Sequence, residues 1–410
     1  MSRRALPLLL ALTWTAACSD DGGSQDEVGD TGSSSDTGTS DSDTTDTGDT
    51  DTGEPEPELV AGCDGASFYV APDDPAARGA WAVGARTVLV DGLTTEVWYP
   101  AAWGSEQGQD PKGYDIRLAL PASEQDKIAD ELAPPQICDC YDGLPLDEAH
   151  GPYPVVVFVH GTASWRSQSL TQMAHWASRG FVVVSSDHPG LWLADILGPL
   201  CGQMAPGQNL SGDTDKVLAA LTAPAGDLAF LAGHIDLTRV AVAGHSAGGG
   251  AAANQTDKPG VRVSIPLASG QAAKPSATLE STLFMGGLAD GVVAYSGTQN
   301  AYDGSAPVKR LVGLDNAGHL AFSDICELEN DQGQDILEIA VEAGVCGAEF
   351  AGFLFDCDPS FLDAATAKMI INHATTSVLE EVLQCSDAGD RFADLQTTYP
   401  DVAEYQEALQ

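Results

Sequence analysis

Six short apolar runs between positions 154 and 315 constrain the fold of this chain more than any other feature. Each run is continuous and rich in β-branched residues, as expected for strands that are buried on both faces of a sheet. Stretches with helical spacing separate several of them, among them SQSLTQMAHWASRG and DTDKVLAALTA. Alternating strands and helices predict an α/β fold with a mostly parallel central sheet covered by helices. The runs are PVVVFVHG, GFVVVSSDHPG, RVAVAGHS, VRVSIPLAS, STLFMGG and KRLVGLD.

Further elements are expected on either side of these runs. ARTVLVDG and TTEVWYP predict an N-terminal hairpin that turns at Asp91 and Gly92. The tail from about residue 360 is expected to be helical, most clearly in ATAKMIINHATTSVLEEVL. With 410 residues, of which 43% are hydrophobic, the chain can fill one large core or two modest ones. We assign residues 59–410 to one folded domain.

The first 58 residues are expected to lie outside that domain. Residues 1–18 begin with two arginines and an apolar run too short to span a bilayer, which is typical of a secretory signal peptide. Small residues before Cys18 resemble a bacterial lipobox and predict lipidation of Cys18, the alternative being simple cleavage and release. Residues 19–58 are acidic and rich in Thr, Ser and Gly, and predict a disordered tether. Together these features predict an exported protein, either a cell-envelope lipoprotein or a secreted one.

Charge and cysteine content narrow the partners and cofactors. The chain has 60 acidic and 18 basic residues, a net charge of −42, and most of this charge lies beyond residue 58. Nucleic acid is therefore not an expected partner, and membrane contact is expected only through the N-terminal lipid. Eight cysteines besides Cys18 favour disulfides whose pairing stays open. We interpret CDC at 138–140 as two disulfide ends, because no second Cys or His pair at ligand spacing accompanies it. A monomer is expected.

The motif Gly244-His245-Ser246-Ala247-Gly248 follows one of the predicted strands and precedes an Ala-rich helical stretch. A strand-to-helix turn of this kind is so sharp that side chains flanking the serine would collide, so glycine is required on both sides. The turn presents the serine at a helix N-terminus, where amides and the helix dipole favour a developing negative charge. Ser246 is therefore predicted to be a nucleophile.

A serine nucleophile needs a base, and triads at such turns follow the chain order Ser, acid, His. Only His319 and His373 lie beyond Ser246 in the sequence. His319 follows a predicted strand directly and is the predicted base, whereas His373 lies within an apolar helical pattern. The histidines beside the other motifs are interpreted as structural or pocket-wall residues: His160, His188 and His245.

The acid should follow the strand after VRVSIPLAS, and STLFMGGLADGVV places Asp290 there. Asp315 is a local competitor, but it lies too close to the base in the chain to reach the far nitrogen of the imidazole. Asp303 is another competitor for the acid, farther from His319 in the chain. For the oxyanion, one amide is expected from Ala247 and the second from Thr162 in the loop after VVVFVHG, with Gly161 the next choice for that second position.

These motifs together resemble the α/β-hydrolase superfamily, in its dienelactone hydrolase and platelet-activating-factor acetylhydrolase branch. The resemblance rests on YPVVVFVHGTASWRSQSLTQMAHWASRGFVVVSSDHPG, DLTRVAVAGHSAGGG, the Asp of GGLADGVV and the His of NAGHL, and spans most of residues 80–325. It implies the α/β-hydrolase fold and ester hydrolysis without a metal or organic cofactor. The serine turn also resembles that of secreted polyester hydrolases and cutinases. Dienelactone hydrolases often use a cysteine nucleophile, so Ser246 argues against that particular reaction.

The predicted function is serine-dependent hydrolysis of a small or lipid-like carboxylic ester. Two alternatives stay open: hydrolysis of amides or peptides with the same triad, and a surface-displayed binding module that keeps the fold without its chemistry. The segment 190–212 lies where this fold commonly inserts a cap. Either it lines an acyl or aromatic site together with Trp165, or it is a surface loop that folds its apolar residues inward. The apolar residues concerned are Trp192, Leu193, Ile196 and Leu197.

Overall fold

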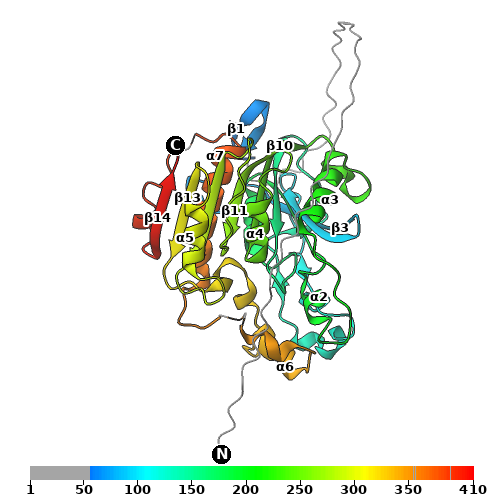
Figure 1. The fold of residues 1–410 in the computed structure, drawn as a ribbon. Coiled ribbons are helices and arrows are strands. Elements are labelled where there is room, and N and C mark those ends of the chain that lie inside the picture. Colours follow the sequence, from blue (N-terminus) through cyan, green and yellow to red (C-terminus); the bar gives the residue numbers. More distant parts are fainter. Residues whose placement is uncertain (1–55, 354, 356, 388) are drawn as a thin grey trace, which may run out of the picture. The chain divides into compact units, whose positions relative to one another are not determined.

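A ten-stranded sheet forms the centre of the computed structural model, which describes residues 56–353, 355, 357–387 and 389–410 (Figure 1). The strand order from edge to edge is β14-β13-β12-β11-β10-β8-β9-β4-β3-β7. All of the described residues belong to one compact unit. The predicted signal peptide, Cys18 and the tether as far as residue 55 lie outside the described residues.

The six apolar runs form the six central strands, which are all parallel to one another. Every residue of the strand 153–159 is buried, since this strand lies between two parallel neighbours and under helices on both faces. The predicted parallel α/β sheet is therefore confirmed. The strands are β8 (Tyr153–Val159), β9 (Val182–Ser186), β10 (Ile235–His245), β11 (Val261–Leu267), β12 (Ser281–Gly287) and β13 (Lys309–Leu314).

Beyond β9, the sheet continues with the predicted hairpin. β3 (Val83–Val90) and β4 (Leu93–Pro100) pair antiparallel, and the two residues between them, Asp91 and Gly92, have φ angles of 44° and 85°. Two left-handed residues are what a tight hairpin turn requires, which explains the Asp-Gly pair. The short strand β7 (Tyr141–Asp142) completes this edge.

At the opposite edge, the expectation of a helical tail is only partly right. α7 (Ala364–Leu383) and the short α8 (Leu395–Thr398) are helical, but the chain ends in β14 (Val402–Ala408), which pairs antiparallel with β13. The β14 sequence is polar, with only its first residue fully buried. Its strand structure depends on hydrogen bonds to β13, which no local pattern in the sequence announces.

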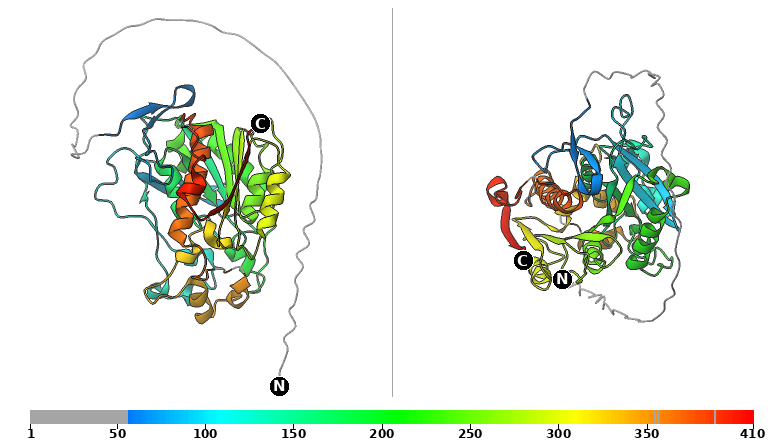
Figure 2. Two further views of the ribbon diagram at one scale, coloured as in Figure 1. Left: turned by 90° about the vertical axis from the view of Figure 1, so that its left-hand side faces the viewer. Right: turned by 90° about the horizontal axis from the view of Figure 1, so that it is seen from above.

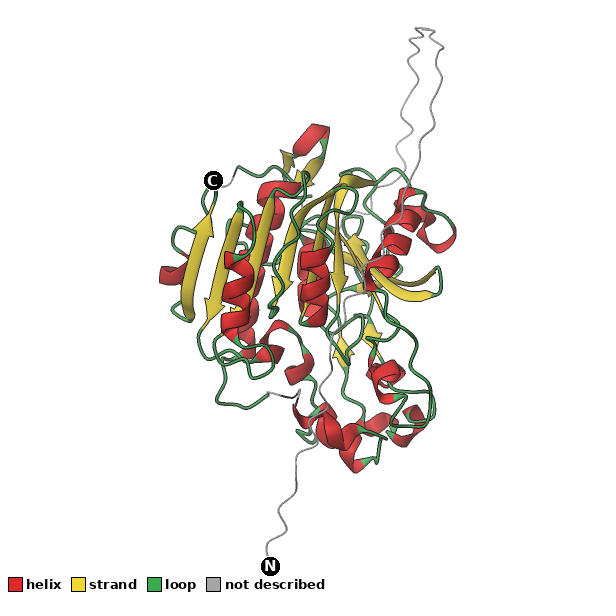
Figure 3. Ribbon diagram, in the orientation of Figure 1, coloured by secondary structure: helices red, strands yellow, loops and turns green. Residues whose placement is uncertain are grey.

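Helices cover both faces of the sheet, as Figure 2 and Figure 3 show. Alternate residues of the strands point to opposite faces, so Val156 and Phe158 pack in one core cluster and Val155 and Val157 in another. None of the helices within the described residues combines the length and the hydropathy needed to cross a membrane. α1 (Leu170–Ser178) and α7 pack on one face, and α3 (Leu210–Thr222), α4 (Ala247–Asn254) and α5 (Tyr295–Asp303) on the other.

Short elements lie outside the main sheet. α2 (Leu193–Leu197) and α6 (Ile336–Glu342) lie beyond the end of the sheet at which the parallel strands terminate (Figure 3). Because parallel strands place their functional residues at this end, the two helices are positioned to cover a site there. The remaining strands form two small sheets, β1 (Leu59–Ala61) with β2 (Ser67–Tyr69) and β5 (Gly113–Tyr114) with β6 (Gln136–Ile137).

Among the described residues, six cysteines form disulfides: Cys63–Cys385, Cys138–Cys140 and Cys326–Cys357. Both cysteines of CDC are disulfide ends, as expected, but they belong to the same bond. A bend in the chain brings their Cα atoms to 4.9 Å, within the range that a disulfide spans. Cys201 and Cys346 carry free thiols in this structure.

Candidate active site

Ser246 occupies a strained turn between β10 and α4. Its backbone has φ 56° and ψ −118°, a conformation that non-glycine residues rarely adopt, and its amide donates to the carbonyl of Leu267 at 2.9 Å. Such strain persists only where the surrounding structure imposes it, and it is concentrated at functional sites. The predicted serine turn is present, with Ser246 immediately before the first turn of the helix.

The glycines of the motif are required by close backbone approach. A Cβ at Gly248 would lie 1.9 Å from the carbonyl oxygen of Val159, the last residue of β8. A Cβ at Gly244 would lie 2.4 Å from the carbonyl oxygen of Gly248 and 2.7 Å from that of Val159. No side chain fits at either position, because the atoms in the way belong to the backbone. The helix therefore packs directly against the strand ends.

The structure brings Asp290 and His319 into direct contact. Asp290 follows β12, and one of its carboxylate oxygens lies 2.8 Å from Nδ1 of His319. Its other oxygen accepts the backbone amides of Val292 and Val293 at 2.8 and 2.7 Å, which fixes the orientation of the carboxylate. Only 8% of Asp290 and 3% of His319 are exposed, so the pair is shielded from water.

The competing residues lie elsewhere. Asp315 and Asp303 are exposed, at the ends of β13 and α5 respectively. His373 is buried within α7, where its Nε2 bonds to the carbonyl of Arg391. None of the three lines the cavity that contains Ser246 and His319.

The loop after β8 lies directly beside Ser246. A Cβ added to Gly161 would lie 3.5 Å from Cβ of Ser246. The Gly161 amide already donates to Oε1 of Gln168 at 2.6 Å, and the Ala163 amide donates to the Leu191 carbonyl at 3.0 Å. Between them, the Thr162 amide meets no hydrogen-bond acceptor among the described residues. The two candidate amides therefore differ: that of Gly161 is already bonded to Gln168, whereas that of Thr162 has no acceptor among the described residues.

Gln168 is a residue of this site that the sequence reasoning missed. It is completely buried, and its amide nitrogen lies 3.1 Å from Nδ1 of His245, whose Nε2 lies 2.9 Å from the carbonyl oxygen of His319. Since the carboxamide nitrogen can only donate and the carbonyl can only accept, His245 accepts at Nδ1 and donates from Nε2. Burial, together with the neighbouring His319, holds the pKa of His245 well below its usual value and keeps the ring neutral.

This chain of bonds links three separate parts of the site: the Gly161 loop, the residue before Ser246 and the backbone of His319. No sequence signal indicates Gln168, because a glutamine seven residues after a Gly turn belongs to no known motif. Its role depends on its burial among distant segments. His245, by contrast, was expected to be a structural or pocket-wall residue, and it bonds and lines the cavity accordingly.

His160 and His188 form a second buried pair beneath the same loop. His160 donates from Nδ1 to the Gly161 carbonyl and accepts the amide of His188 at Nε2, at 2.8 and 3.1 Å. Burial, with a smaller contribution from His188, lowers the pKa of His160 to about 3. His188 in turn contacts Asp213 of α3. Both rings thus tie the loop to the elements below it and lie outside the cavity lining.

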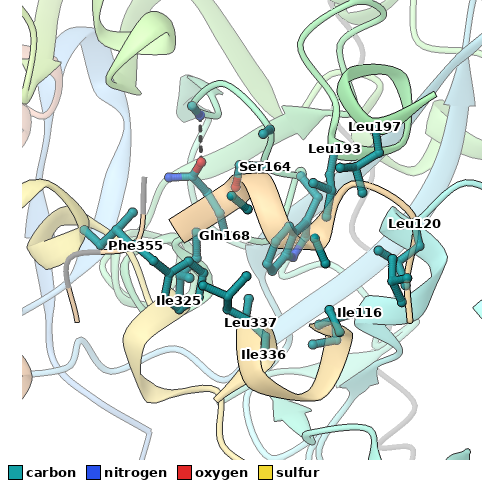
Figure 4. A pocket seen from close by; sticks show the side chains of 18 of the residues that line it. Ile116, Leu120, Ser164, Gln168, Leu193, Leu197, Ile325, Ile336, Leu337 and Phe355 are labelled. Carbon is teal, nitrogen blue, oxygen red and sulfur yellow. Dashed lines mark hydrogen bonds between the residues drawn. The ribbon is translucent and has the colours of Figure 1, made fainter. Parts of the chain in front are cut away.

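Ser246 and His319 line an apolar cavity with a volume of about 150 Å³. Three chain segments form what we call the apolar wall: 116–134, 190–203 and 325–353 together with Phe355 (Figure 4). Within 190–203, Leu193 and Leu197 line the cavity, but Trp192 and Ile196 do not. Trp165 also lines it, so the alternative in which this segment and Trp165 line a site holds for part of the segment. The contribution of 325–353 was not foreseen, because this segment follows His319 in the chain and carries no motif.

Within the described residues, no three His, Cys, Asp or Glu side chains are grouped so as to hold a metal ion.

Comparison with known proteins adds a family and a structural neighbour. Residues 118–190, which include the Thr162 loop and end before Ser246, match the family described as platelet-activating factor acetylhydrolase, isoform II. The solved structure of a ferulic acid esterase from Streptomyces cinnamoneus has a TM-score of 0.53 and 19% sequence identity, over 81% of this chain and 97% of that chain. No curated protein shows a significant match to the sequence. The chain therefore has the fold of an α/β-hydrolase and, over residues 118–190, is similar to the platelet-activating factor acetylhydrolase family.

Proposed function

We propose that this protein is a carboxylic ester hydrolase that acts through an acyl-enzyme intermediate on Ser246. The observation that carries the proposal is the buried Asp290–His319 pair, whose histidine lines the same cavity as a serine held in a strained turn. The family match and the esterase neighbour support hydrolysis of esters, because the first is named for an acetylhydrolase and the second for an esterase.

In the proposed reaction, His319 accepts the Ser246 hydroxyl proton at Nε2 as the serine oxygen attacks the ester carbonyl. Asp290, bonded to Nδ1, holds the ring in the tautomer whose Nε2 is free to accept a proton and stabilises the imidazolium that forms. His319 then gives the proton to the departing alcohol, leaving the acyl group on Ser246. Water attacks that acyl group with His319 again as base, releasing the acid and restoring the serine.

The negative charge that develops on the carbonyl oxygen requires donors aimed at one point. We assign these to the amides of Ala247 and Thr162. Ala247 is the first residue of α4, so its amide has no partner within the helix. Thr162 is preferred to Gly161 because the Gly161 amide is already bonded to Gln168.

The decisive experiment compares hydrolysis of p-nitrophenyl esters, from acetate to long acyl chains, by the wild-type protein and by Ser246→Ala. We expect turnover to fall by a factor on the order of 10³ to 10⁶. Ser269→Ala is the matched control, since this serine follows the neighbouring strand β11, is buried and lies outside the cavity lining. Equal loss in both variants would show that a change in folding, rather than a lost nucleophile, accounts for the result.

Two alternative functions have distinct signatures. An amidase would hydrolyse p-nitroanilides at rates comparable to the esters, and this result would replace the ester assignment. A binding module would leave Ser246 unlabelled by a fluorophosphonate, a reagent that reacts quickly only with an activated serine. Rapid labelling of the wild-type protein that is lost in Ser246→Ala would exclude the binding module.

Export and anchoring complete the proposal. The three disulfides are compatible with export, because such bonds persist in oxidising compartments. We propose that Cys18 carries the lipid. Metabolic labelling with a radioactive fatty acid should mark the wild-type chain and not Cys18→Ser, and an unlabelled wild-type chain would favour release without an anchor.

A further inference from the structure

Two free cysteines meet in the apolar wall. Cys201 follows α2, and Cys346 lies between α6 and the 3₁₀ helix Ala348–Phe353. The thiol of Cys201 donates to the backbone carbonyl of Cys346 at 3.4 Å, although 145 residues separate them. The two segments are also packed tightly beside the cysteines, because a Cβ at Gly347 would lie 2.8 Å from the Leu200 side chain.

The third wall segment joins the others at the same place. Glu124 accepts the backbone amide of Cys346 at 2.7 Å and pairs with Lys127 at 2.7 Å, and Lys127 donates to the Gly344 carbonyl at 2.8 Å. Lys127 is an exposed surface residue, so its ion pair alone contributes little to stability. All three segments of the wall thus meet at the two cysteines, two of them through the cysteines themselves and the third through Glu124 and Lys127.

We propose that Cys201 and Cys346 are a site of oxidation, at which a fourth disulfide fastens the apolar wall and limits the size of ester that the cavity accepts. The two thiols give up two protons and two electrons to a disulfide oxidant R–S–S–R. The Cys201–Cys346 bond forms, and two molecules of R–SH are released. The oxidant is of the class that must already act on this chain to form the other three disulfides.

The surroundings of the pair indicate when this bond forms. Desolvation, reinforced by the neighbouring Cys346, raises the pKa of the Cys201 thiol to about 12. Thiol–disulfide exchange proceeds through the thiolate, so in the folded, reduced protein Cys201 is a poor nucleophile at neutral pH. The bond is therefore expected to form while the chain folds in the presence of the oxidant, and to close slowly if the folded protein is first reduced.

The consequence for specificity follows from the place of the bond and rests on the proposed esterase function. Leu197, four residues before Cys201, and Val345, next to Cys346, both line the cavity. A bond between the two segments keeps these side chains together. Without it, the segments are held only by packing and by the polar contacts of Glu124 and Lys127. Separation of the segments widens the cavity at Leu197 and Val345, whereas Ser246 and His319 belong to other segments and stay in place.

The first test is chemical and independent of catalysis. The full chain is produced in an oxidising compartment, alkylated without reduction, and digested for mass spectrometry. We expect a Cys201–Cys346 linked peptide alongside the three disulfides described above. Alkylated Cys201 and Cys346 in a chain whose three described disulfides are intact would overturn the proposal.

The second test concerns the role of the bond. Cys201→Ser with Cys346→Ser should lower Tm by several degrees and raise kcat/KM for long acyl esters relative to acetate by about three- to tenfold. Cys63→Ser with Cys385→Ser is the matched control, because that disulfide lies outside the cavity lining. It should lower Tm without changing the chain-length profile. A profile equally unchanged in both double variants would refute the limit on ester size, and turnover of no ester by any variant would instead count against the proposed function.

Discussion

Two regions of the cavity, which we call its floor and its apolar wall, are held together by different interactions. The floor consists of the proposed triad of Ser246, Asp290 and His319, together with Gln168, His245 and the Gly161–Thr162 pair. Its parts come from strand ends and are locked by backbone contacts and buried hydrogen bonds. The apolar wall comes from long connections between those strands and is held by side-chain packing, surface ion pairs and one pair of thiols. The comparison predicts that changes to the floor abolish the reaction, whereas changes to the wall alter the choice of substrate.

The largest effect is expected from Asp290→Asn. Asparagine keeps the size of the side chain but presents an amide that favours the wrong imidazole tautomer, so kcat should fall by a factor on the order of 10⁴. Steady-state kinetics on a p-nitrophenyl ester measure this loss. Asp315→Asn is the control, since that carboxylate is exposed and does not line the cavity. A large loss in Asp315→Asn with activity retained in Asp290→Asn would reverse the assignment of the acid.

Next in size is the effect of a single methyl group at the serine turn. Gly248→Ala places a Cβ 1.9 Å from a backbone oxygen, so we expect the free energy of unfolding to fall by about 3 kcal/mol or more, with loss of activity. Urea denaturation and ester hydrolysis measure the two effects. Gly207→Ala is the matched control, because nothing lies within 4 Å of the added atom. Equal stability of the two variants would mean that the floor is less rigid than its packing implies.

A wall residue should behave differently. Leu197→Ala removes buried atoms from the cavity lining, so the free energy of unfolding should fall by roughly 2 to 3 kcal/mol. Activity on acetate should change little, while kcat/KM for long acyl chains relative to acetate should rise by about tenfold. Hydrolysis of p-nitrophenyl esters of increasing acyl length measures this change. The wild-type protein and the variant are compared at one temperature below the Tm of both. A uniform loss on all esters would place Leu197 in the support of the floor instead.

The smallest effect on activity is expected from the buried neutral histidines, which instead make the stability depend on pH. Burial lowers the pKa of His160 and of His175 to about 3, and holds that of His245 well below its usual value. In the unfolded chain these rings titrate near pH 6.5, so below that pH the unfolded state binds protons that the folded state does not. Their contribution to stability is therefore complete above about pH 6.5 and is lost progressively toward pH 3. Each ring contributes up to about 1.4 kcal/mol per pH unit in that window.

Urea denaturation between pH 7 and pH 5 measures this slope, before most carboxylates begin to titrate. His175 lies on α1 and does not line the cavity. His175→Gln should therefore reduce the slope of the unfolding free energy against pH by up to about 1.4 kcal/mol per pH unit, and leave the pH profile of catalysis unchanged. The wall segments contain no histidine, so this dependence belongs to the floor and the core beneath it. A stability that is flat from pH 7 to pH 5 would contradict the assignment of neutral buried rings.

The sequence by itself determined the parallel sheet and the serine turn. Continuous valine-rich runs are buried wherever they occur, and Gly244 and Gly248 mark a local backbone geometry that only glycine permits. Chain order then narrowed the acid and the base to Asp290 and His319, which the structure brings together. These features could be inferred because each depends on a short stretch of chain or on the direction of a strand.

Only the tertiary structure decided the rest. Four features join residues far apart in the chain: the bond of Gln168 to His245, the C-terminal strand, the wall segment 325–353 and the Cys63–Cys385 disulfide. Nothing near Gln168 indicates that its side chain will meet the Gly161 amide and the His245 ring. The physical reason is that local sequence fixes backbone conformation and burial pattern, whereas hydrogen-bond partners, cavity walls and disulfide pairs depend on which distant segments the fold places in contact.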